Sequence, residues 1–304
     1  MNTSSESLLK THAVCVDCKM KLRLGLSFIE RNLRGSIDGL NMYVIPTIFG
    51  TTTFKLIDKL PRLQEAFNVV VSYEWLKDLE SKMSMYREFE DPSLTYMLNV
   101  LFGHRVSSHF AYQHLIQNVP VTRLLEVSKK FRDASSKFAD LFVSKIDDWS
   151  ICFDEIYRIF PLRKSRTELV EWKPIVELFN SILSETSYPK ENLIAKAILF
   201  AKIQRYGTWE GYNIRPPKSK DVEMCIGLLK YNLLIIALNS IGVLQMESGR
   251  MNRGIIPDRD IESFLSLQGY DEVQSALFLL GVLVGKIGVE QYKMGDEKKS
   301  VLDK

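Results

Sequence analysis

The spacing of apolar residues along the chain is mostly helical, and the most apolar stretch spans residues 271–292. Asp271 and Glu272 stand at its start, where a helix N-terminus favours negative charge. Lys286 and Glu290 interrupt the apolar run well short of the ~20 residues that a membrane span needs. We therefore expect a buried helix of a helical bundle, and no membrane. Three glycines share one side of this helix and predict a face that another backbone approaches closely: Gly281, Gly285 and Gly288.

Further segments have the apolar spacing of helices. They are residues 19–32, 61–86, 120–143, 149–160, 175–183, 191–206, 221–246 and 260–267. In the first of these, Leu22, Leu26 and Ile29 are expected to face inward, with the basic side chains pointing outward. The helix at 120–143 has a start signal, because Asn118 or Val119 would cap it and a proline at residue 120 would lie in its first turn.

Two β-branched and aromatic runs, Met42 to Phe49 and Leu94 to Phe102, predict strands. Pro46 cannot donate a backbone hydrogen bond, so the first run is expected to be an edge strand or to contain a bulge. Gly103 to Arg105 is expected to form the turn after the second run, and Phe110 to Asn118 is ambiguous. These patterns predict a mainly α fold with a smaller α+β N-terminal part and a C-terminal helical bundle. We place the α+β region at residues 1–145 and the bundle-like region at 146–304.

The composition is that of a soluble globular protein. The 304 residues are 46% hydrophobic and 25% charged, with a net charge of +3. That charge permits local basic patches and does not by itself indicate nucleic-acid binding. Four cysteines in a chain of this length do not form a disulfide framework, and the N-terminus lacks the pattern of a signal peptide. We expect a reducing, cytoplasmic location.

Cys15 and Cys18 form a Cys-x-x-Cys pair, which supplies two thiolates at the spacing that tetrahedral zinc needs. A structural zinc site needs four ligands, and the other two cysteines, Cys152 and Cys225, are isolated within helical patterns. His12 could be a third ligand. Three interpretations stay open: half of a Zn2+ site, ordinary thiols, or a redox pair, although the βαβ setting of a redox pair is absent.

No catalytic motif is present among the phosphate-binding, nucleotide-binding, hydrolase and metalloprotease patterns. His104, His109 and His114 are five residues apart, a spacing that alternates faces on a strand and scatters side chains around a helix. We therefore expect them to be surface or turn residues and the protein not to be an enzyme.

Clusters of basic residues in three loops are the better functional candidates. The first cluster is Arg163, Lys164 and Arg166; the second is Arg215, Lys218 and Lys220, beside Trp209 and Tyr212; the third is Arg250 and Arg253. Basic side chains neutralise phosphates, and aromatic rings stack on unpaired bases. The second cluster combines both properties in one predicted flexible loop. The alternative is that these loops are simply solvated.

Several segments also resemble one protein family, in the same order along the chain. They are the Cys-x-x-Cys pair followed by K-L-x-x-G and by MYVIP at residues 42–46; IQNVPVTRLLEV at 116–127; FDEIYRIFPLRKS at 153–165 with the ELFNSIL and NLIAKAI helices; and LFLLGVLVGKIGVEQ at 277–291. Together they resemble the large subunit of type I-B CRISPR Cascade complexes, the Csh-type family. The resemblance extends from Cys15 to Tyr292.

This resemblance implies a non-catalytic subunit of an RNA-guided DNA surveillance complex in antiviral defence. The implied partners are the CRISPR guide RNA, the target DNA, other Cascade subunits and the helicase–nuclease that cuts. In the family a second cysteine pair usually lies upstream and further helices follow, so we expect a fragment, a shortened relative or a lost zinc site. Individual contact residues are not transferred.

Two other classes of function stay open. A helical scaffold or adaptor that binds only protein would show a large apolar face on the glycine-containing helix at 271–292. An enzyme would show a pocket that contains His104, His109 or His114 beside a carboxylate.

Overall fold

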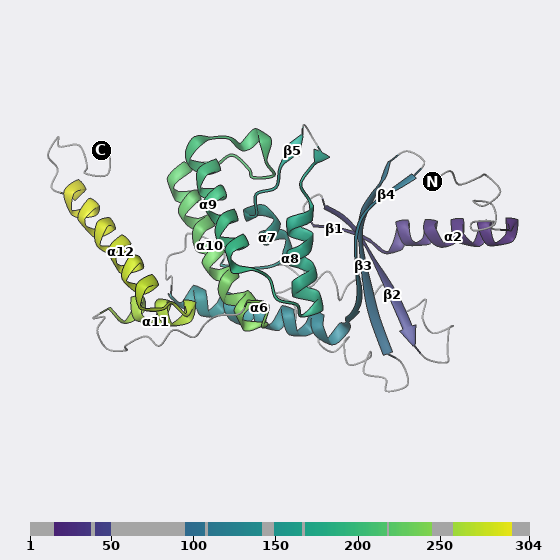
Figure 1. The fold of residues 1–304 in the computed structure, drawn as a ribbon, viewed down its shortest axis with the longest axis horizontal. Helices are drawn as coiled ribbons and strands as arrows, with labels where there is room; N and C mark the ends of the chain where they lie inside the picture. Colours follow the sequence, from purple (N-terminus) through teal and green to yellow (C-terminus); the bar gives the residue numbers. More distant parts are fainter. Residues whose placement is uncertain are drawn as a thin grey trace, which may run out of the picture.

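The computed structural model describes most of the chain (Figure 1). The described residues are 15–37, 40–49, 95–106, 109–141, 149–165, 168–217, 219–244 and 258–293. The helix predicted at 61–86 and most of the loop at 247–258 lie outside them.

An antiparallel sheet of four strands forms the N-terminal part, in the order β1-β2-β3-β4. The strands are β1 (Arg34–Ile37), β2 (Leu40–Phe49), β3 (Thr95–Val106) and β4 (His109–Pro120). The two predicted strands are confirmed, and the ambiguous segment at 110–118 belongs to β4. The predicted turn at 103–105 is wrong, because β3 continues to Val106. A register shift between Phe102 and Gly103 accommodates the glycine inside the strand instead of ending it.

The prediction that the run from Met42 to Phe49 is an edge strand or contains a bulge is wrong, because β2 lies between β1 and β3 and pairs with β3 in an unbroken register. Pro46 nevertheless lies where β2 has a neighbouring strand on one side only. The pairing of β1 with β2 ends at Tyr43, whereas Pro46 lies opposite Leu98 of β3. In the part of the chain that the structure describes, no strand flanks Pro46 on its other side. The missing backbone donor therefore breaks no ladder there.

Asn99 joins three strands at a second register shift, between Leu98 and Val100. Its amide nitrogen donates to the Ile45 carbonyl at 3.2 Å and to Thr47 Oγ1 at 2.7 Å, and its Oδ1 accepts from the Asn118 backbone N–H at 3.1 Å. Asn118 has a left-handed backbone (φ 57°) and belongs to β4. The prediction that Asn118 or Val119 caps a helix that already contains Pro120 is therefore wrong, since the helix begins at Val121.

Helices form the rest of the fold, as predicted. They are α2 (Val16–Asn32), α6 (Val121–Leu141), α7 (Phe153–Ile159), α8 (Lys173–Ser184), α9 (Lys190–Tyr206), α10 (Lys220–Ser240), α11 (Arg259–Gln268) and α12 (Glu272–Lys293). A short hairpin of β5 (Lys164–Ser165) and β6 (Glu168–Leu169) and a 3-10 turn, η2 (Trp209–Gly211), interrupt them. The prediction of a mainly α fold with a smaller α+β N-terminal part is confirmed.

One apolar core runs from the sheet into the helices. The inner face of the sheet buries Met42, Val100 and Phe102 fully, and α6 and α10 bury apolar faces against the same core. Phe102 stacks on Phe179 of α8 at 6.4 Å between ring centroids, and Phe179 stacks on Phe153 of α7 at 4.4 Å. This run of aromatic rings joins the sheet to the helices.

The helix α12 departs most from its prediction. The sequence predicts a buried helix, but most of its apolar side chains are exposed; Leu277, for example, is 64% exposed. A side-chain carbon added at Gly281 or Gly285 would meet nothing within 4 Å, so no other described backbone approaches this side. By length and composition alone, residues 222–240 of α10 and 272–291 of α12 are apolar enough to cross a membrane.

The helix α2 departs in the same way. Leu22 and Leu26, predicted to face inward, are exposed, and Ile29 alone of the three packs partly against the core. Apolar spacing predicts that a helix has an apolar face, but it does not predict that the same chain covers that face.

Arg123 of α6 is buried at the point where three helices meet, and it is only 3% exposed. Its Nε donates to the Ile182 carbonyl in the last turn of α8 at 2.9 Å, and its Nη2 donates to the Ile241 carbonyl after α10 at 3.4 Å. Glu126 on the next turn of α6 pairs with Nη1 at 2.8 Å. The guanidinium thus satisfies carbonyls that helix C-termini leave without an intrahelical partner.

Replacing Arg123 with methionine is expected to lower the free energy of unfolding by roughly 2–4 kcal/mol, because two buried carbonyls lose their donor. Urea denaturation followed by circular dichroism measures this change. Lys129→Met, at an exposed position of the same helix, is the matched control and should change stability by less than about 0.5 kcal/mol. Equal stability of the two variants would contradict the role given to Arg123.

Candidate functional site

The structure brings two of the predicted basic loops together. Arg163 and Tyr212 form an isolated antiparallel bridge, so the segment that leads into the β5–β6 hairpin lies beside the segment that follows η2. Arg163 and Arg215 are exposed, and Lys164 is half-buried. Residues far apart in the sequence therefore form one basic and aromatic surface, which we call the basic–aromatic face and define as Arg163, Lys164, Trp209, Tyr212 and Arg215.

The buried side chain of Asn213 connects the two segments that form this face. Its Oδ1 accepts from the Leu162 backbone N–H at 2.8 Å, and its Nδ2 donates to the Tyr157 carbonyl of α7 at 2.7 Å. Its own backbone N–H donates to the Leu162 carbonyl at 3.1 Å. The buried Asn213 side chain thus ties the end of α7 and both loops to one another.

The aromatic residues of the face are held by packing and by a hydrogen bond. The Trp209 indole packs beside Gly207, whose φ is +74°, and its Nε1 donates to Gln204 Oε1 at 3.1 Å. Trp209 and Tyr212 are both half-buried and pack against the core. Rings that are already held in place lose little conformational entropy when a base stacks on their exposed part.

A polar cavity of about 570 Å³ opens next to this face, between α7, α9 and α10. Its charged lining residues are Arg158, Arg215, Lys230, Glu155 and Glu223. Glu155 pairs with Arg158 at 2.6 Å and with Lys230 at 2.9 Å. Three cations against two carboxylates leave one positive charge in excess, which favours an anion such as a phosphate.

The other predicted nucleic-acid-binding residues are not placed by the structure. Arg166, Lys218, Arg250 and Arg253 lie outside the described residues. Lys220 is the first residue of α10, and its side chain is not described. These residues stay predictions.

The Cys15–Cys18 pair stands at the start of α2, and both cysteines are exposed and form no disulfide. Cys15 Sγ accepts the Cys18 backbone N–H at 3.3 Å and caps the helix. This hydrogen bond lowers the pKa of Cys15, and the side-chain hydrogen bond with Cys15 raises the pKa of Cys18.

No third cysteine, histidine or carboxylate completes a metal-binding group among the described residues. Two thiolates alone do not fill a tetrahedral site, so the residues that the structure describes would hold zinc only together with further ligands. His12, the candidate third ligand, lies outside them. Of the isolated cysteines, Cys152 is buried, which raises the pKa of its thiol to about 12.

The three histidines lie on neighbouring strands. His104 of β3 pairs with Ala111, His109 pairs with Val106, and His114 of β4 lies opposite Phe102. Only the His114 side chain is described. Neither the polar cavity nor the groove described next contains a histidine.

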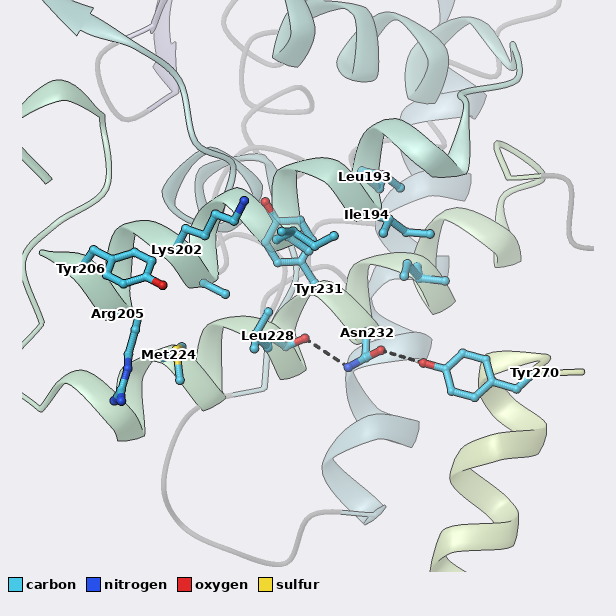
Figure 2. A pocket seen from close by; sticks show the side chains of 14 residues that line it. Leu193, Ile194, Lys202, Arg205, Tyr206, Met224, Leu228, Tyr231, Asn232 and Tyr270 are labelled. Atoms are coloured by element: carbon cyan, nitrogen blue, oxygen red, sulfur yellow. Dashed lines mark hydrogen bonds between the residues drawn. The ribbon is translucent and has the colours of Figure 1, made fainter. Parts of the chain in front are cut away.

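A second hollow, which the sequence did not predict, lies between α9 and α10 (Figure 2). This apolar groove has a volume of about 650 Å³. Lys202, Arg205 and Tyr206 lie toward one end of it and Tyr270 at the other, as Figure 2 shows. The Tyr270 hydroxyl donates to Asn232 Oδ1 at 3.3 Å. Ile194 and Ile198, which remain exposed on α9, are the signal in the sequence that could have indicated the groove.

Gly227 of α10 faces Phe200 of α9, and a side-chain carbon added at Gly227 would overlap the Phe200 ring. The ring is buried, since Phe200 is 4% exposed. The two helices therefore pack at a spacing that only glycine permits at this point.

Comparison with known proteins places both halves of the chain in one family. Residues 151–304, just over half of the chain, match the family model described as the C-terminal domain of CRISPR-associated protein TM1802. Residues 1–119 match the model described as the central domain of the same protein. No curated protein and no solved structure matches the chain.

Replacing Asn213 with alanine is expected to lower the free energy of unfolding by roughly 2–4 kcal/mol, because a buried N–H and a buried C=O lose their partner. Limited proteolysis should then cut near residues 207–217 faster than in the wild type. Asn192→Ala, at an exposed position of α9, is the control for loss of an amide side chain. Unchanged stability and unchanged cleavage would show that Asn213 does not hold the two loops together.

Proposed function

Since the chain belongs to the CRISPR-associated protein TM1802 family, we propose that it is a non-catalytic subunit of a type I-B CRISPR surveillance (Cascade) complex. In this proposal the basic–aromatic face binds the backbone of the guide RNA or of the target DNA. The ordered resemblance of its segments to the type I-B large subunit supports this assignment.

The observation that carries the proposal is the bridge between Arg163 and Tyr212. It gathers cations and aromatic rings from two distant segments onto one fixed surface, beside a cavity with an excess positive charge. Cations attract the phosphates of a single strand, and half-exposed rings stack on its bases without regard to sequence. Such a surface suits a complex in which base pairing reads the sequence and the protein reads the backbone.

The remaining parts of the proposal follow from the same resemblance. Other Cascade subunits and the helicase–nuclease are proposed as protein partners, and the cytoplasm as the location. Cys15 and Cys18 are proposed as half of a Zn2+ site, whose remaining ligands would come from elsewhere. The absence of a catalytic motif in the sequence supports a non-catalytic role.

A scaffold that binds only protein is the second candidate function. The exposed apolar surface of α12 favours it, because a soluble protein rarely leaves so large an apolar helix face uncovered. The two candidates differ in whether nucleic acid is bound.

Co-purification tests the assignment to Cascade. The tagged chain would be expressed with the neighbouring genes of its locus, and RNA that remains after a high-salt wash would be sequenced. We expect repeat-derived guide RNA together with partner subunits. Partner proteins without RNA would favour the scaffold, and a chain that purifies alone would overturn both functions.

Replacing Arg163, Lys164 and Arg215 together with glutamine is expected to weaken binding of a single-stranded RNA or DNA by ~10-fold or more. The slope of log affinity against log salt should fall by about 2, because each phosphate contact on a single strand contributes about 0.7. Fluorescence anisotropy with labelled oligonucleotides measures both quantities. In the matched control, glutamine replaces three lysines that are exposed on α6: Lys129, Lys130 and Lys137. The total change of charge is the same in both variants. Equal loss in both variants would show a general charge effect and contradict the assigned face.

A further inference from the structure

The exposed side of α12 has the apolar spacing of a coiled-coil seam. The five side chains that form it are Val273, Leu277, Leu280, Val284 and Ile287, at alternating steps of four and three residues. All five are at least 41% exposed. Alternating steps of this kind place the side chains in one stripe along the helix, which is the pattern that packs against another helix.

Near the start of α12, the side opposite this stripe packs against its own chain. Phe278 stacks on Phe264 of α11 at 5.1 Å between ring centroids and lies 6.3 Å from the ring of Tyr270. These contacts fix the first turns of α12, so that the helix diverges from α9 and α10 (Figure 1). The apolar stripe therefore faces away from the chain's own core.

The apolar groove between α9 and α10 has walls with the same spacing. On α9 the wall residues are Ile194, Ile198, Ala201 and Arg205; on α10 they are Met224, Leu228, Tyr231 and Ile235. Each set repeats at steps of four, three and four residues. Two neighbouring helices that both present such a row form a slot for a third helix.

We propose that the α12 helix of a second copy of this chain occupies the groove between α9 and α10. The uncharged stretch 273–285 of α12 is about 18 Å long, and the groove from residue 193 to 205 of α9 has the same length, at 1.5 Å per residue. Antiparallel to α9, α12 would bring Asp271 and Glu272 to the basic end of the groove, near Lys202 and Arg205. The opposite direction would instead bring Lys286 to that end.

The occupant is the α12 of another copy because the chain's own α12 cannot reach the groove as it is held. Tyr270 lies at the end of the groove and is bonded to Asn232. Only residues 269–271 connect α11 to α12. The same α12 would therefore enter the groove from the Tyr270 end and lie parallel to α9, which would bring Lys286 to the basic end and break the contact with Phe264. Exchange between two copies keeps these contacts and closes as a two-fold dimer.

Light scattering after size-exclusion chromatography of the full chain tests the proposal. We expect wild-type chain to form a dimer whose fraction rises over a roughly hundredfold range of concentration. Ile198→Glu in the groove and Leu280→Glu on α12 should each weaken dimerisation at least about tenfold, because a carboxylate enters an apolar contact. Both positions are more than half exposed in the single chain, so both variants should fold, as circular dichroism would check.

A mixture of the two variants is the decisive measurement. The groove variant retains an intact α12 and the α12 variant retains an intact groove, so the mixture should restore one of the two contacts and produce heterodimer. Val222→Glu, at an exposed position of α10 outside the groove, is the matched control and should dimerise like wild type.

Two outcomes would overturn the proposal. The first is wild-type chain that stays monomeric at every concentration. This outcome overturns the proposal even if α12 is then found to bind lipid vesicles or another protein. A mixture that forms no more dimer than either variant alone would also do so. Neither result affects the nucleic-acid test, because Ile198 and Leu280 lie outside the basic–aromatic face.

Discussion

The buried guanidinium of Arg123 is the interaction on which the arrangement of helices depends. It lies on α6, which continues directly from the last strand of the sheet, and it donates to carbonyls at the C-terminal ends of α8 and α10. A helix end carries partial negative charge, so one cation can stabilise two such ends at once. The sheet is thereby joined to α8 and to α10, and α10 forms one wall of the apolar groove.

Elements that depend on local spacing could be predicted from the sequence, whereas elements that depend on distant partners could not. The helices α8 and α9 and the strand β2 follow from apolar periodicity and from neighbouring prolines. The end of β3 does not, because Gly103 stays in the strand only when β4 pairs with it across a register shift. Asn118 likewise has the composition of a helix cap, but Asn99, nineteen residues earlier, holds it in β4.

The candidate site shows the same division. The sequence grouped the basic residues by loop and identified Trp209 and Tyr212 as their aromatic neighbours. It could not show that Arg163 pairs with Tyr212, because that pairing depends on the buried side chain of Asn213. The failure at α12 has a different cause: its periodicity is the same whether its own chain or another molecule covers the helix, so the pattern predicted an apolar face without its partner.

The contact between Gly227 and Phe200 has a mechanical consequence for the two hollows beside α9 and α10. Both residues line the polar cavity, while the next residue along α10, Leu228, lines the apolar groove. Because a side-chain carbon at Gly227 would overlap the Phe200 ring, α9 and α10 have no room to approach more closely at this contact. The apolar groove and the polar cavity thus meet at this contact, and an occupant of the groove that tilted α9 against α10 would also change the shape of the cavity.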